Sequence, residues 1–107
     1  MHITESSYNV FTTTGGAKAG PTTVPGARVK YMGGTVSLTA GSSATVRIHR
    51  DGASTGQVID SFTVNFTSFS TGQHFFDPGV DAGTGIYVEV VALTGSSPAV
   101  DVVTYWQ

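Results

Sequence analysis

Three consecutive residues near the middle of the chain, His49, Arg50 and Asp51, place an imidazole, a guanidinium and a carboxylate side by side. The same triplet occurs in the catalytic loop of protein kinases, where an asparagine five residues after the aspartate holds magnesium. Position 56 is glycine here, and no motif for binding ATP accompanies the triplet. An Asp-Gly pair that follows an alternating segment is typical of a turn between strands. We therefore predict a structural role for these residues, with Asp51 and Gly52 shaping a turn.

The three histidines, His2, His49 and His74, are not spaced as metal ligands, because no HxH or HxxxH pair occurs. We predict that they face solvent from strands. Strands that are distant in sequence can still be neighbours in a sheet. A metal-assisted hydrolase built from His49, Asp51 and His74 is therefore one hypothesis for the structure to test.

The carboxylates of Asp77, Asp81 and Glu89 are the other candidates for chemistry. A calcium loop of the EF-hand type needs oxygen ligands at alternate positions and a closing glutamate, and only the two aspartates are suitably placed. The segment DPGVDAGTG fits better as a turn in which aspartate side chains bond their own backbone. The serines never occur as GxSxG. The sequence thus predicts no catalytic residue, no metal, no cofactor and no enzyme activity.

The composition limits the partners. Charged residues make up 11% of the 107 residues and the formal net charge is −2, whereas an average soluble domain has roughly 25% charged residues. The five cationic residues are dispersed, which argues against nucleic-acid binding. There is no cysteine and no apolar run near the length of a membrane span. So weakly charged a surface suggests that a partner covers part of it.

Apolar and polar side chains alternate with a period of two along most of the chain, which is the pattern of strands with one buried face. The expected strands are residues 8–13, 27–32, 35–39, 45–50, 60–66, 73–76, 85–93 and 100–106. Segments rich in Gly, Ser, Asp and Pro separate them, and no helix is expected. We predict an all-β fold: a single-domain, jelly-roll-like β-sandwich of about eight strands over residues 1–107. Residues 1–7 would be an N-terminal arm, flexible or bound to a partner.

Aromatic residues are the remaining candidates for binding. Phe62 and Phe66 share one strand face and are expected in the core. The other aromatics are more than one small core can obviously bury, and exposed aromatics mark protein interfaces or sugar platforms. The candidate partner contacts are Tyr8, Phe11, Phe69, Phe75, Phe76, Tyr105 and Trp106. The alternative is that most of them are core residues of two packed sheets.

Four segments carry a resemblance to a known family. They are YNVFTTT, AKAGPTTVPGARVKYMGG, ATVRIHRDGASTGQVI and DAGTGIYVEVVALTGSSPAVDVVTYW. From about Tyr8 onward the chain resembles small all-β virion proteins encoded among the head and tail genes of tailed bacteriophages. The segment SFTVNFTSFSTGQHFF and the final Trp106-Gln107 depart from that pattern.

The resemblance implies a subunit that decorates or cements a capsid, or that forms part of a fibre or tail. We interpret the chain as a capsid decoration protein that binds and stabilises the major capsid lattice. Its expected partners are the major capsid protein and neighbouring virion proteins, its expected assembly is a homotrimer, and its expected location is the virion after synthesis in the host cytoplasm without a signal peptide. The alternative is a receptor-binding or carbohydrate-binding module in which Tyr87, Tyr105 or Trp106 stacks on sugar rings.

Overall fold

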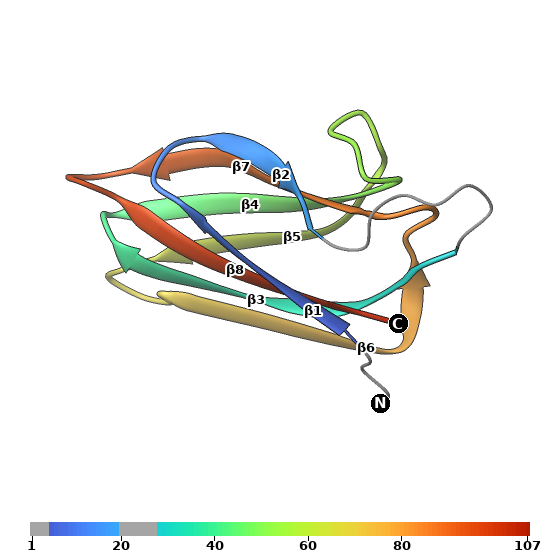
Figure 1. Cartoon of the computed structure of the whole chain (residues 1–107). Helices are drawn as coiled ribbons and strands as arrows, with labels where there is room; N and C mark the ends of the chain where they lie inside the picture. Colours follow the sequence, from blue (N-terminus) through green and yellow to red (C-terminus); the bar gives the residue numbers. More distant parts are fainter. Residues whose placement is uncertain (1–4, 20–27) are drawn as a thin grey trace.

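The computed structural model describes residues 5–19 and 28–107. Within them it contains eight β-strands and no helix, so no membrane-spanning helix occurs in this part of the chain. The strands are β1 (Glu5–Phe11), β2 (Gly15–Lys18), β3 (Lys30–Ala40), β4 (Ser43–Arg50), β5 (Val58–Asn65), β6 (Thr71–Asp81), β7 (Ile86–Thr94) and β8 (Ala99–Trp106). They form two four-stranded sheets that lie face to face (Figure 1). The predicted all-β sandwich is confirmed.

The order of the strands defines the topology. Sheet A has the order β1-β8-β3-β6 and sheet B the order β2-β7-β4-β5, and every pair is antiparallel. The pairs β1/β8, β2/β7, β3/β6 and β4/β5 are nested, as in one long hairpin that has been rolled up into two layers. This is the jelly-roll arrangement of eight strands.

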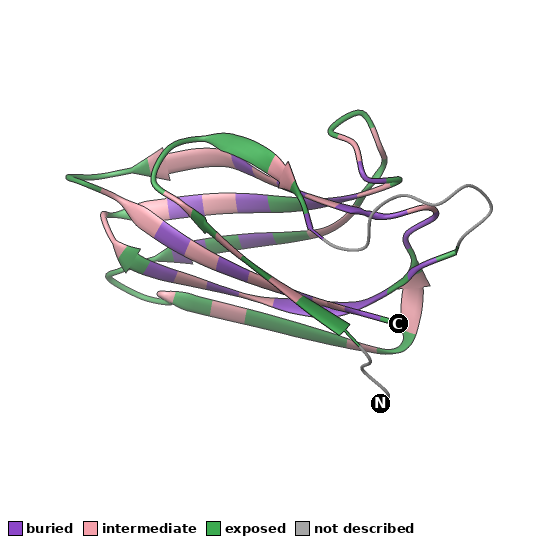
Figure 2. Ribbon diagram, in the orientation of Figure 1, coloured by how far each residue is buried: buried purple, intermediate pink, exposed green. Residues whose placement is uncertain are grey.

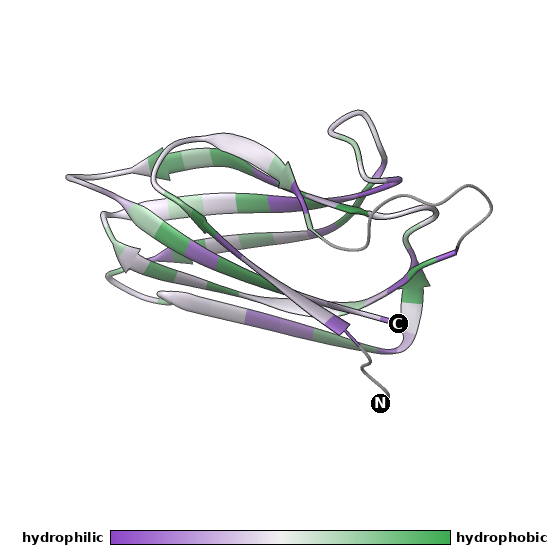
Figure 3. Cartoon of the chain, viewed as in Figure 1, coloured by the Kyte–Doolittle hydropathy of each residue, from purple (hydrophilic) through white to green (hydrophobic). Residues whose placement is uncertain are grey.

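The core lies between the two sheets and consists mainly of valine and other aliphatic side chains. Burial alternates along β4, β7 and β8 (Figure 2), and hydropathy follows the same alternation (Figure 3). In β8, for example, Val100, Val102, Thr104 and Trp106 point inward. Because successive side chains of a strand point to opposite faces, the intervening residues form the outer surface of the sheet.

The predicted number of strands is confirmed, but two elements differ from the expectation. The Gly-rich segment at Gly15–Lys18 was expected to be a loop, and it forms β2 by pairing with β7. The two strands expected at 27–32 and 35–39 merge into the single strand β3, which begins only at Lys30. Residues 28 and 29 precede it, and residue 27 lies outside the described residues. The Gly33-Gly34 pair was interpreted as a turn, whereas it lies at a β-bulge within β3.

Strand β6 is also longer than predicted, because it continues to Asp81 through the segment that was expected to be a loop. Its pairing with β3 is interrupted at residues 76–79, which lie between the paired residues Phe75 and Val80. Of the expected N-terminal arm, residues 5–7 form the start of β1, and residues 1–4 lie outside the described part of the chain.

Candidate interaction face

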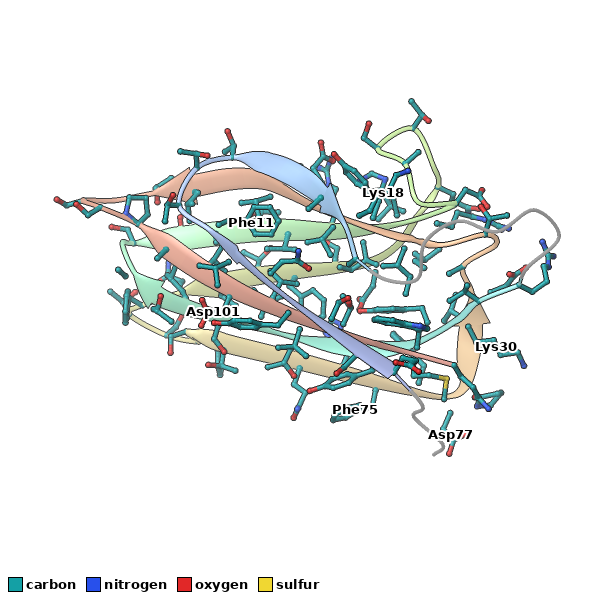
Figure 4. The ribbon with its side chains drawn as sticks, viewed as in Figure 1. Phe11, Lys18, Lys30, Phe75, Asp77 and Asp101 are labelled. Atoms are coloured by element: carbon teal, nitrogen blue, oxygen red, sulfur yellow. The ribbon has the colours of Figure 1, made fainter. Side chains whose placement is uncertain are left out.

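The outer face of sheet A is the surface that collects most of the predicted contact residues. Its side chains form three rungs, a rung being one row of residues paired across the four strands. The rungs are Ser6–Tyr105–Gly33–Phe75, Tyr8–Val103–Thr35–Gln73 and Val10–Asp101–Ser37–Thr71. We call these residues the sheet A outer face. Phe75 and Asp77 project from β6 on the side away from sheet B (Figure 4).

Exposed apolar side chains are concentrated on this face. Tyr8 is 63% exposed, Val10 54% and Phe75 47%, and they are three of the six exposed large apolar residues among those described. Val103 and Tyr105 lie between them and are half-buried. Together these side chains form an apolar band across β1, β8 and β6. Contiguous exposed apolar surface of this kind marks sites of protein interaction.

A glycine positions the aromatic part of the band. Gly33 separates Phe75 from Tyr105 in their rung, and the two rings meet across it with their centroids 5.7 Å apart. The φ angle of Gly33 is +125°, and a Cβ atom there would lie 2.0 Å from the carbonyl oxygen of His74. Only glycine fits this bulge, and the rings of its two neighbours cover the backbone that it leaves bare.

The face is almost without charge. Asp101 is the one ionisable acid or base on the three rungs apart from the two tyrosines, and its hydrogen bond and negative charge raise the pKa of Tyr8. The neutral polar groups bind one another, since Gln73 Nε2 donates to Thr35 Oγ1 at 3.1 Å.

The outer face of sheet B has a different character. Two of its rungs are Gly16–Glu89–Arg47–Ser61 and Lys18–Tyr87–His49–Val58. Four of these eight positions carry a charged or basic side chain. The tyrosine ring lies across Gly16, where a Cβ atom would come within 2.2 Å of the Tyr87 hydroxyl. This face is ionic, whereas the sheet A outer face is apolar.

His49 is buried, which corrects the prediction that it faces solvent. Its ring is on the outward side of β4 as the alternation requires, but the loop of residues 51–57 folds over it and leaves it 5% exposed. Nδ1 donates to the carbonyl oxygen of Gly56 at 2.8 Å, and Nε2 lies 2.9 Å from Glu89 Oε1. Both ring nitrogens of His49 therefore face hydrogen-bond acceptors.

His74 lies in a second polar cluster at the β5/β6 edge, where its side chain is 43% exposed, so the prediction that it faces solvent is confirmed. Its Nδ1 is 2.7 Å from Asp60 Oδ1, and its ring stacks on Phe62 with centroids 4.3 Å apart. The other carboxylate oxygen of Asp60 accepts a 2.7 Å hydrogen bond from the Tyr31 hydroxyl. Burial raises the pKa of Tyr31 far above its usual value, and the hydrogen bond to Asp60 raises it further. This cluster ties β5 of one sheet to β3 and β6 of the other.

The metal-site hypothesis is not supported by this arrangement. His49 and His74 contact different carboxylates, Glu89 and Asp60, in different places. No three His, Cys, Asp or Glu side chains gather in a metal-binding group within residues 5–19 and 28–107. His2 lies outside the described residues.

Both predicted aspartate turns are present. Asp51 and the following Gly52 have φ angles of 63° and 61°, the left-handed conformation that an Asp-Gly turn favours. Asp81 Oδ1 accepts a hydrogen bond from the backbone N–H of Gly83 at 2.8 Å. That bond lowers the pKa of Asp81, and the nearby positive charges of Arg28 and Arg50 act in the same direction.

The structure distributes the seven candidate contact residues over three environments. Tyr8, Phe69 and Phe75 are exposed, and Phe69 is the most exposed of them at 75%. Tyr105 is half-buried on the sheet A outer face, while Phe11 and Phe76 are half-buried against the core. The seventh, Trp106, belongs to the core.

Trp106 is 7% exposed and has little surface to offer a partner. The alternation could have shown this, because Trp106 is in phase with Val100 and Val102. Phe66, which was expected in the core, is 48% exposed because β5 ends at Asn65 and Phe66 lies in the following turn. Sequence reasoning also missed Val10, an exposed member of the apolar band.

The fold and the face define the class of molecule: a jelly-roll β-sandwich with one ionic and one apolar outer face. No protein-family model matches this chain, and no curated protein matches it. Among solved structures, the chain is similar to one from the acidic stable capsid structure of Helicobacter pylori bacteriophage KHP30. The TM-score is 0.62 at 9% sequence identity, over 98% of this chain and 87% of that chain. At this identity the likeness is one of fold, and it extends over nearly the whole jelly roll.

Proposed function

We propose that this chain is a structural protein of a bacteriophage virion, and that it decorates the capsid by laying the sheet A outer face on the shell. The observation that carries the proposal is the contrast between the two outer faces, since only that of sheet A is both apolar and nearly uncharged. The fold likeness to a chain of a phage capsid structure supports the virion as the location. The proposal is one of contact without catalysis.

The chemistry of the face suits adhesion. Each Å² of apolar surface that the contact removes from water contributes roughly 25 cal/mol. Its Tyr, Val, Thr and Phe side chains have few rotatable bonds, so ordering them on binding costs less than ordering lysines or glutamates. Many copies on one lattice make even a weak individual contact sufficient. The major capsid protein is the proposed partner, and the homotrimer expected from the resemblance is the proposed assembly.

The structure offers less support for the alternative, a carbohydrate-binding module, than for a decoration protein. Of the three aromatics suggested for stacking on sugars, Trp106 is in the core and Tyr87 is half-buried over Gly16. Only Tyr105 lies on the apolar face. No single observation in the structure favours a sugar over a protein surface.

A pair of charge insertions tests the proposal. Val10→Asp places a second carboxylate beside Asp101 on the sheet A outer face, and Thr63→Asp places one on an exposed position of sheet B. Co-sedimentation with phage shells prepared without the protein should show normal binding for wild type and Thr63→Asp and at least tenfold weaker binding for Val10→Asp. Circular dichroism checks that both variants fold.

Two results would count against the proposal. Equal binding of both variants would remove the sheet A outer face as the contact. Failure of the wild-type protein to bind shells, together with its absence from intact virions by electron microscopy, would remove the decoration role.

A further inference from the structure

Each sheet of the sandwich ends in two edge strands, and these differ in how they are protected. The edges are β1 and β6 in sheet A, and β2 and β5 in sheet B. An edge strand presents unpaired backbone N–H and C=O groups that can pair with another chain. Proteins protect such edges with very short strands, lysine, proline, bulges or charges that point inward.

Three of the four edges carry these devices. Strand β6 contains Pro78, and its register with β3 is broken by the bulge at Gly33. The register of β5 is shifted next to His49, and its Asp60 points inward between the sheets with a 7% exposed side chain. Strand β2 has only four residues and ends in Lys18.

Strand β1 is the least protected of the four. It runs for seven residues, ESSYNVF, and pairs with β8 in an unbroken register. It contains no proline, glycine or lysine. Its one charge is at the first residue, Glu5, which pairs with the inward-pointing Trp106 but is itself exposed at the end of the strand. Within the described residues β8 is its one strand neighbour. On its outer side it carries Tyr8 and Val10, the two most exposed apolar residues of the sheet A outer face.

We propose that β1 pairs antiparallel with β1 of a second copy of this chain, centred on Tyr8. A two-fold contact must be complementary to itself, and centring the pair on Tyr8 is the register that matches all seven residues. It sets Tyr8 against the partner's Tyr8, and Ser6 against the partner's Val10. Cross-strand pairs of aromatic residues stabilise antiparallel strands.

The charge of β1 agrees with this register. The central pairing holds the two Glu5 carboxylates six residues apart along the strands, about 20 Å at roughly 3.4 Å per residue. That distance exceeds the Debye length of about 8 Å at physiological ionic strength, so their repulsion is screened. A register shifted toward the N-terminus would bring the carboxylates together and lose pairs.

The pairing makes one continuous sheet from both copies. An antiparallel pair has its two-fold axis perpendicular to the sheet, so both sheet A outer faces point the same way. The dimer therefore presents twice the apolar area to one surface. In a homotrimeric assembly this contact joins two trimers. The pairing needs no capsid, so an experiment can disprove it without bearing on the proposed function, and the reverse also holds.

Disulfide trapping tests the pairing and its register, because the chain contains no cysteine. Opposite Cα atoms in antiparallel strands are about 4.5–5.5 Å apart, which a disulfide spans. Under mild oxidation Tyr8→Cys should form a covalent dimer. Ser6→Cys mixed with Val10→Cys should form the mixed dimer, with at least tenfold less of either symmetric dimer. Thr63→Cys on the exposed face of edge strand β5 is the control and should stay unlinked.

Light scattering of the unmodified protein supplies the second measurement. We expect an even number of copies at high concentration, and half that mass for Tyr8→Lys, which places two lysines against each other. A protein that stays monomeric at every concentration would overturn the proposal. So would an odd number of copies, or cross-linking of Tyr8→Cys no faster than that of Thr63→Cys.

Discussion

The outer faces of sheets A and B belong to strands of the same jelly roll, yet they differ in charge. One of the twelve positions on the three rungs of sheet A is a carboxylate, whereas the two rungs of sheet B described above carry Lys18, Arg47 and Glu89 as well as the buried His49, and the next rung, Ala92–Thr45–Thr63, is uncharged. The core constrains only the inward residues of each strand. The outward residues are under no such constraint and can suit either water or a partner, and the proposed function assigns the partner to the sheet A outer face.

The largest expected difference between the two faces is the loss of stability when a glycine in each is replaced by alanine. Gly33→Ala should lower the free energy of unfolding by about 3 kcal/mol, because it adds backbone strain and drives a Cβ atom into the His74 carbonyl. Gly16→Ala on sheet B meets only the movable end of the Tyr87 side chain and should cost about 1 kcal/mol or less. Urea unfolding measures both. Equal losses would show that Gly33 is not held as the structure places it.

The ionic face should depend on its buried histidine. Glu89→Ala leaves His49 Nε2 buried without its partner and should cost about 2 kcal/mol. Glu89→Gln retains an acceptor oxygen and should cost less. Glu5→Ala, at the exposed start of β1, serves as the control and should change stability by less than about 0.5 kcal/mol. If Glu89→Ala proved as neutral as Glu5→Ala, the contact would contribute nothing.

At alkaline pH the buried Tyr31 of sheet A and the exposed Tyr8 of its outer face should ionise differently. The pKa of Tyr31 is raised above that of an unfolded tyrosine, so its stabilising effect is complete below about pH 10 and is lost as the pH rises further. The loss is about 1.4 kcal/mol per pH unit. Tyr8 is exposed, so although its pKa is also raised, it should ionise while the protein is folded. Phenolate absorbance measured alongside circular dichroism checks this. Ionisation of all four tyrosines before unfolding would contradict it.

A smaller effect is expected at a buried hydroxyl. Within the described residues Thr104 Oγ1 is buried and has no hydrogen-bond partner, so Thr104→Val should raise the free energy of unfolding by about 1 kcal/mol. Thr63→Val, on the exposed face of sheet B, should change stability by less than about 0.5 kcal/mol. Thermal unfolding compares the two. A destabilised Thr104→Val would show that the hydroxyl has a partner after all, such as a buried water.

Strict alternation made the best predictions of the fold. The strands around Val46, Val88 and Val102 were all expected, because one buried face forces a period of two on the sequence. Strand β2 was missed because its Gly-Gly-Ala-Lys sequence has no strand pattern and is extended only through its pairing with β7. The bulge at Gly33 was mistaken for a turn, since both conformations favour glycine.

The sequence by itself determined that the chain is all-β, that valines and isoleucines fill the core, and that few charges reach the surface. These follow from composition and period, which are local properties. The tertiary structure decided the rest. It brought Tyr8, Tyr105 and Phe75 from three strands onto one face, and it closed a loop over His49. Strand order and register set those neighbours, and no local pattern encodes them, because they arise from pairing between segments far apart in the chain.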